Sequence, residues 1–124
     1  MSVKYKIAIV GSRVYGGSGK YNDFVKYMDH YIPDVSIIDY LISGGTYGID
    51  TYAEWYAKEK NVKMKVILPE WKKYGKSAGF KRNMQIINEA DIIFAFWDGK
   101  SKGTLHDINI AKNFNKEITI IKTL

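Results

Sequence analysis

Apolar and polar positions along the chain follow two alternating periods. Short runs rich in β-branched residues, spaced as in strands, are separated by longer segments with one apolar helical face. In residues 21–31, for example, Phe24, Val25 and Met28 lie on one helical face, and Pro33 follows as a stop signal. The pattern predicts strands at residues 5–10, 36–42, 63–68, 91–97 and 117–121, and helices at residues 21–31, 50–60, 78–89 and 104–113.

Single helices separate the predicted strands, so consecutive strands cannot pair as hairpins. This alternation predicts a parallel sheet with right-handed crossovers and helices on both faces. We therefore expect one α/β domain over residues 1–124: a doubly wound, mainly parallel five-stranded sheet of Rossmann type. The strand at residues 91–97 is apolar enough to be buried on both faces. Asp50 or Thr51 is the expected N-cap of the second helix.

Composition narrows the class of protein. The chain has 124 residues, of which 46% are hydrophobic and 26% charged, as in ordinary globular domains. Its apolar runs are far shorter than the roughly 20 residues that span a bilayer, and no signal-peptide pattern opens it. We expect a cytoplasmic protein with no membrane contact. The chain has no cysteine and two histidines, so we expect neither a metal site nor a cofactor.

The formal net charge is +6, and the 19 basic residues comprise 17 lysines and two arginines. A positive balance attracts nucleic acid, acidic surfaces or anionic small molecules. Lysine, isoleucine, asparagine and tyrosine are all abundant, as A/T-rich coding sequences produce, so the lysine count says little about a partner. Arg13 lies two residues past the first predicted strand, and Arg82 lies in the first turns of the third predicted helix, so both are expected at the same edge of the sheet. A guanidinium binds phosphate or carboxylate through two parallel hydrogen bonds, and a surface ion pair is the alternative.

The 11 glycines are distributed unevenly. They lie in predicted loops or first helical turns, in the four connections that leave the first four strands: Gly11, Gly16, Gly17 and Gly19; Gly44, Gly45 and Gly48; Gly75 and Gly79; Gly99 and Gly103. The connections at the opposite edge contain none. Open α/β sheets bind ligands at the carboxyl ends of their strands, where glycine lets backbone approach phosphate closely. We expect a phosphate-binding edge, with tight turns as the alternative.

Two common nucleotide-binding motifs are incomplete. The glycine-rich run at residues 16–20 lacks the first glycine and the Ser/Thr metal ligand of a nucleoside-triphosphate loop. No Gly-x-Gly-x-x-Gly follows the first strand, and no acid ends the second. The sequence therefore favours neither a Mg-dependent NTPase nor a dinucleotide dehydrogenase.

Acidic and aromatic side chains accompany the arginines at the expected edge. Asp50 is placed either to cap a helix or to accept ribose hydroxyls. Asp107, one turn into the last helix, is placed to act as a general acid or base. Trp71 and Tyr74 follow the third strand, where a ring can stack on a base, form a hydrophobic lid or contact a second subunit. His106 is expected to point away.

Four segments in this order resemble the SLOG superfamily, which unites the DNA-processing protein DprA with the cytokinin-activating LOG enzymes. They are Gly11-Ser12-Arg13 and residues 43–50, 71–83 and 96–104. Within the superfamily they are most similar to the small YspA/YpsA-like branch. The resemblance covers nearly the whole chain and implies a Rossmann-like fold.

The resemblance also implies a nucleotide-derived ligand, of the ADP-ribose type or a related phosphorylated nucleotide. Its phosphates would lie at the loops of residues 11–13 and 99–104, with Gly44 and Gly45 lining the pocket. The candidate ligand-binding residues are Gly11, Ser12, Arg13, Ser43, Gly44, Gly45, Asp50, Trp71, Arg82, Asn83, Asp98, Gly99, Ser101, Gly103 and Thr104.

Three functions compete. The first is a binding protein for such a ligand, acting as a sensor or as a phage protein that sequesters an immune signal. The second is a nucleoside 5′-monophosphate phosphoribohydrolase, an N-glycosidase with Arg82 and Asp107 as its catalytic pair. LOG enzymes use an arginine and the glutamate of Pro-Gly-Gly-x-Gly-Thr-x-x-Glu; here Gly103-Thr104-x-x-Asp107 ends in a shorter acid, and Asp98-Gly99 stands at the start.

The third function is DprA-like single-strand DNA binding through dispersed lysines, with a steep dependence on salt. The aromatic content of 15% indicates a homodimer or a higher homo-oligomer.

Overall fold

A computed structural model of the chain describes residues 3–12 and 18–123. Arg13, Gly16 and Gly17 lie outside the described residues. Within them, five parallel strands form one sheet in the order β3-β2-β1-β4-β5. The strands are β1 (Tyr5–Gly11), β2 (Ile38–Ser43), β3 (Met64–Val66), β4 (Ile92–Trp97) and β5 (Glu117–Lys122). The predicted α/β Rossmann-type class is confirmed.

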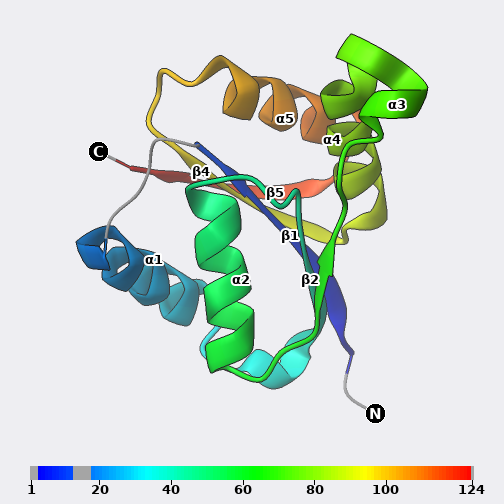
Figure 1. The fold of residues 1–124 in the computed structure, drawn as a ribbon. Coiled ribbons are helices and arrows are strands. Elements are labelled where there is room, and N and C mark those ends of the chain that lie inside the picture. Colours follow the sequence, from blue (N-terminus) through cyan, green and yellow to red (C-terminus); the bar gives the residue numbers. More distant parts are fainter. Residues whose placement is uncertain (1–2, 13–17, 124) are drawn as a thin grey trace.

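Helices cover both faces of the sheet (Figure 1). One face packs against α1 (Ser18–Tyr31) and α2 (Ile49–Glu59), around fully buried side chains such as Ile9, Phe24 and Tyr56. The other packs against α4 (Ala78–Glu89) and α5 (Lys102–Asn113), around Ile86, Ile93 and others. The four central residues of β4 are buried, as its apolar sequence predicts, and its two end residues are half-buried.

The boundaries differ from the predicted ones where side chains bond to local backbone. A 3₁₀ turn (η1, Val35–Ile37) precedes β2, because Asp34 accepts a hydrogen bond from the Ser36 N–H at 3.0 Å. α5 begins two residues before the predicted start, with Ser101 as its N-cap. The predicted cap of α2 is wrong: Gly48 is the N-cap, and Asp50 lies inside the first turn.

A short helical segment that the sequence pattern did not predict follows β3. It consists of α3 (Trp71–Tyr74) and a 3₁₀ turn, η2 (Gly75–Ser77), and stands at the upper right corner of Figure 1. All its side chains are exposed, so no apolar periodicity marks it. β3 itself is shorter than predicted, three residues at the edge of the sheet.

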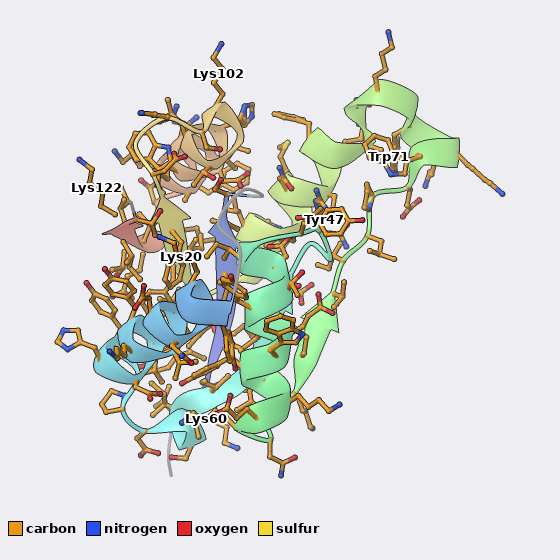
Figure 2. The ribbon with its side chains drawn as sticks, turned by 60° about the vertical axis from the view of Figure 1, so that its left-hand side comes forward. Lys20, Tyr47, Lys60, Trp71, Lys102 and Lys122 are labelled. Carbon is orange, nitrogen blue, oxygen red and sulfur yellow. The ribbon has the colours of Figure 1, made fainter. Side chains whose placement is uncertain are left out.

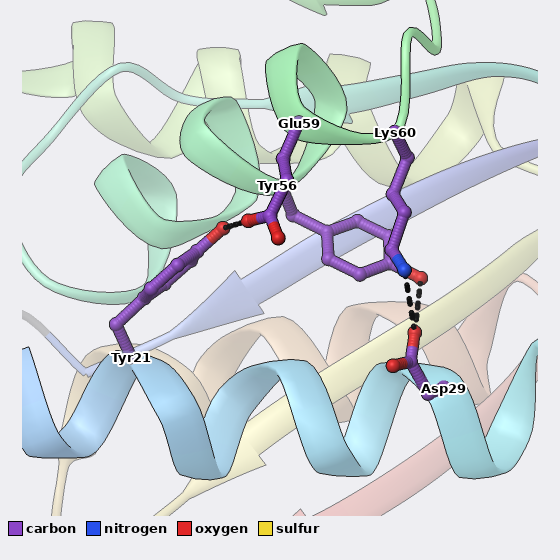
Figure 3. A network of polar contacts seen from close by, with 5 residues as sticks. All are labelled: Tyr21, Asp29, Tyr56, Glu59 and Lys60. Carbon is purple, nitrogen blue, oxygen red and sulfur yellow. Dashed lines mark hydrogen bonds and ion pairs between the residues drawn. The ribbon is translucent and has the colours of Figure 1, made fainter.

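Polar side chains tie α1 to α2 (Figure 3). Tyr21 donates a hydrogen bond to Glu59 at 2.7 Å, and Tyr56 donates one to Asp29 at 3.1 Å. Lys60 adds an ion pair to the same Asp29 carboxylate at 3.5 Å. Burial and these carboxylates raise the pKa of both phenols, so each stays protonated and remains a donor. The two helices on this face are therefore held together by polar contacts as well as by the apolar core.

The connections at the two edges of the sheet use different residues at positive φ. At the amino edge, α2 and α5 are followed by Asn61 and Asn115, whose φ angles of 56° and 54° are left-handed. At the carboxyl edge, Gly45, Gly48, Gly75 and Gly99 have positive φ, each in a connection that leaves a strand. Within the described residues no helix has the length and apolar character needed to cross a membrane.

Gly11 permits a close contact between β1 and α2. A Cβ at residue 11 would lie 2.6 Å from Cγ1 of Ile49, a fully buried side chain. The Ile49 N–H also donates to the Ser12 carbonyl at 3.3 Å. The end of β1 therefore lies directly against the start of α2, and no larger residue fits there.

Gly11→Ala should consequently lower the free energy of unfolding by about 1 to 3 kcal/mol, the usual cost of overpacking a core. Gly103→Ala is the matched control, because a Cβ there meets nothing within 4 Å. In the first turn of α5, alanine should raise stability by up to about 1 kcal/mol. Urea unfolding of both variants measures the difference; equal effects would contradict the packing role of Gly11.

Candidate ligand-binding site

A cavity of about 490 Å³ opens at the carboxyl ends of β1 and β4. The sheet order places these strands side by side although two other strands separate them in sequence, so the crossovers change direction between them. Doubly wound sheets bind ligands at such a switch point, in pockets of about this size. The described residues that line it are Val10, Gly11, Ser12, Gly44, Thr46, Asp50, Arg82, Asn83, Ile86, Asp98, Lys100, Ser101, Gly103, Thr104 and Asp107.

Arg82 is a buried cation in the wall of this cavity, with 7% of its surface exposed. Its Nη1 donates to the Gly44 carbonyl at 2.7 Å, and its Nε donates to Asn83 Oδ1 at 2.6 Å. Ile86 and Ile87, on the same helix, are buried in the apolar core between α4 and the sheet and fix the position of α4. The guanidinium is thereby oriented by the backbone of the loop that follows β2 and by the neighbouring Asn83 side chain.

Gly44 allows a cation and a carboxylate to meet beside the loop after β2. A Cβ at residue 44 would lie 2.8 Å from Arg82 Nη1 and 3.1 Å from Asp50 Oδ2. Both groups thus occupy the space that a side chain would fill. Asp50 Oδ2 accepts from the Thr46 hydroxyl at 2.6 Å and from the Thr46 N–H at 3.2 Å. Asp50 therefore secures this loop to the first turn of α2.

Asp107 is a buried carboxyl group in the wall of the cavity. Its side chain is 8% exposed, and Oδ1 has no hydrogen-bond partner among the described residues. Burial raises its pKa to about 7, repulsion from Asp50 adds to the increase, and Arg82 opposes it. Near neutral pH the group therefore exchanges a proton, as a general acid or base must.

The loop after β4 is held by an internal carboxylate. Asp98 Oδ1 accepts from the N–H groups of Lys100 at 2.8 Å and Ser101 at 2.7 Å, which lowers its pKa. The Ser101 side chain accepts from the Thr104 N–H, and the Ser101 carbonyl accepts from Trp97 Nε1 at 3.0 Å. Part of the N–H array expected for phosphate is therefore occupied by Asp98.

The structure brings together most of the predicted site residues. Arg82 and Asp107 of the predicted catalytic pair line one cavity. Ser43, Gly45, Gly99 and Trp71 are not among its described lining residues. Ser43 is buried in β2, Gly45 borders a smaller hollow with Tyr47, and Trp71 lies on α3, close to Gly79 (Figure 2). His106 is exposed and packs edge-on against Phe80.

Four lining residues were not predicted. Thr46 lies in the same glycine-rich loop as Gly44, and Lys100 lies between the predicted residues Gly99 and Ser101. The sequence motifs that identified their neighbours could therefore have identified both residues. Ile86 is one helical turn after Arg82, on the same face. Val10 ends the buried run of β1. In the described part of the chain, no three His, Asp or Glu side chains gather as a metal site would require.

No protein-family model matches the chain. A search of curated proteins finds the Gene 61 protein of Mycobacterium phage D29, 30% identical over 107 residues. The match covers 82% of this chain and 83% of the phage protein. The chain belongs to the family of the phage Gene 61 protein.

Two solved structures of other proteins are similar in fold to this Gene 61 family member. DprA from Streptococcus pneumoniae aligns with a TM-score of 0.74 and 20% identity, over 98% of this chain and 51% of DprA. DprA from Helicobacter pylori aligns with a TM-score of 0.72 and 16% identity, over 98% of this chain and 67% of DprA. The Helicobacter structure is described as showing a single-stranded DNA binding mode. These two matches confirm the predicted Rossmann-like fold.

The chain spans about half the length of the Streptococcus DprA and about two thirds of the Helicobacter protein. The likeness at these identities concerns the Rossmann-like fold alone. What this Gene 61 family member binds must therefore be argued from its own cavity.

The raised pKa of Asp107 predicts a pH-dependent effect of Asp107→Asn. Because the folded protein disfavours the ionised carboxyl, wild-type stability falls as the pH rises from about 4 through about 7. The variant lacks this charge. At pH 8 its free energy of unfolding should exceed that of the wild type by about 2 to 4 kcal/mol, and at pH 4 the two should nearly agree.

Urea unfolding at both pH values measures this effect. Asp98→Asn is the control of opposite sign, since the ionised Asp98 carboxylate holds two backbone N–H groups and its pKa is lowered. Its loss should lower stability at pH 8. An Asp107→Asn variant no more stable than the wild type at pH 8 would contradict the assignment.

Proposed function

We propose that this protein binds a small nucleotide-derived ligand, of the ADP-ribose type or a related phosphorylated nucleotide. The observation that carries the proposal is a cavity at the switch point of the sheet in which a buried arginine stands beside two buried carboxylates. A guanidinium pairs with phosphate, and carboxylates accept hydrogen bonds from ribose hydroxyls. A volume of about 490 Å³ accommodates such a molecule.

The motifs favour membership of the YspA/YpsA-like branch of the SLOG superfamily, and the phage relative favours one of the two roles considered. A cytoplasmic sensor and a sequestering protein both need binding alone. Because the related Gene 61 protein is encoded by a phage, we favour sequestration of a nucleotide signal in the infected cell. A homodimer or higher homo-oligomer is part of this proposal, based on the aromatic content of 15%.

Isothermal titration of the full chain with ADP-ribose, its cyclic isomers and nucleoside monophosphates tests the proposal. Arg82→Lys keeps the charge but loses the planar fork, so affinity for the preferred compound should fall about 10- to 100-fold. Lys112→Ala, an exposed lysine in the last turn of α5, is the control and should change affinity less than twofold. Circular dichroism confirms that each variant is folded.

If every compound binds equally weakly, the proposal that the protein recognises a nucleotide-derived ligand is contradicted. A parallel titration with a single-stranded oligonucleotide, at low and at high salt, tests the alternative of DNA binding. DprA-like DNA binding is favoured by the shared fold and by Lys72, Lys73 and Lys76 around the exposed Trp71 and Tyr74. It would show as tight, strongly salt-dependent binding that Arg82→Lys leaves unchanged.

Hydrolysis of the N-glycosidic bond is a second candidate, favoured by Asp107. A carboxyl group with a pKa of about 7 that lines the same cavity as an arginine suits general acid or base catalysis. The wild type would then release free base from a nucleoside 5′-monophosphate, at a rate that changes with the ionisation of one group near pH 7. Asp107→Ala should abolish the release, and Lys112→Ala should not.

Chromatography of the reaction mixture detects the free base. No release at high protein concentration and long incubation would exclude hydrolysis of these substrates and leave the binding function as proposed.

A further inference from the structure

A second hollow, of about 330 Å³, lies between α3 and α4. Leu68, Ala78 and Met84 give it apolar walls, and Tyr74, Lys81 and Arg82 give it polar ones. Arg82 lines this hollow and the first cavity alike. A ligand that extends from one to the other would therefore pass a buried guanidinium.

Within the first cavity, the carboxylates disfavour a phosphate group at any position away from Arg82. Asp50, Asp98 and Asp107 line it, against Arg82 and Lys100. Asp98 also bonds the Lys100 and Ser101 N–H groups that a phosphate would use at the start of α5. A dianion placed there would approach carboxylates that are already buried or bonded. The same carboxylates suit the hydroxyl groups of a sugar.

The second hollow carries the opposite balance. Lys81 Nζ lies 4.7 Å from the centre of the Tyr74 ring, and Lys73 Nζ lies 5.1 Å from it. The ring thus holds two ammonium groups through cation–π contacts, and one of them, that of Lys81, belongs to a residue that lines the hollow. Glu70 is the acid among the described lining residues, and its charge acts on Lys73. Lys81 and Arg82 are the cations among the described residues that line this hollow.

We propose that this second hollow is the anion subsite of the protein. It takes the phosphate or diphosphate part of a ligand whose sugar hydroxyls face Asp50 and Asp107 in the first cavity, and Arg82 stands between the two parts. The identity of the ligand as a nucleotide rests on the proposed function, whereas the anion subsite does not. The inference replaces the loop of residues 99–104 as the expected phosphate site.

Inorganic pyrophosphate, titrated into the ¹⁵N-labelled full chain, tests the subsite without any nucleotide. In ¹H–¹⁵N spectra the amides of residues 74–85 should shift in a saturable way. Lys81→Ala should weaken this binding about tenfold, as the loss of one charge-assisted contact predicts. Lys72→Ala is the control, because Lys72 is an exposed lysine of α3 and is not among the described residues that line either cavity. It should weaken binding less than twofold.

Shifts confined to residues 99–104, equal effects of the two substitutions, or no saturable shift would each overturn the subsite. The outcome is separable from that of the proposed function. If pyrophosphate binds as expected but no nucleotide binds more tightly than pyrophosphate, the anion subsite stands and nucleotide recognition fails.

Discussion

The hydrogen bond from Arg82 to the Gly44 carbonyl, 2.7 Å long, is the constraint on which the site depends. It joins α4, on one face of the sheet, to the loop that leads into α2 on the other. A buried guanidinium is costly unless its donors are satisfied, so the loop and the helix must keep their relative positions. Gly44 makes the contact possible, because any Cβ at that position would displace the cation or the neighbouring Asp50.

Much of the fold could be predicted from the alternation of strand-like and helix-like segments, because burial of the strands leaves a clear apolar pattern. The glycine distribution also indicated the edge at which the cavity lies. α3 escaped prediction because its side chains are exposed and carry no apolar period. The cap of α2 was assigned to Asp50 or Thr51 by residue preference, whereas Gly48 holds that position and Asp50 bonds Thr46.

The candidate site shows where residue type alone is insufficient. Arg82, Asp50 and Asp107 were selected because their residue types and positions suit a nucleotide, and the fold brings them to one cavity. Trp71 was selected by the same reasoning, but the direction of α3 places it by Gly79 instead. The role of Asp98 depends on which N–H groups its side chain reaches, and that follows from loop geometry that no spacing rule encodes.

The bonded loop after β4 has a consequence for the entropy of binding. Asp98, Ser101 and Trp97 hold its backbone in place through hydrogen bonds within the protein. A ligand entering the cavity therefore does not have to order this segment. The conformational entropy of the loop is lost when the protein folds and not when the ligand binds. For the proposed ligand, such a wall would favour compounds whose shape already fits the cavity.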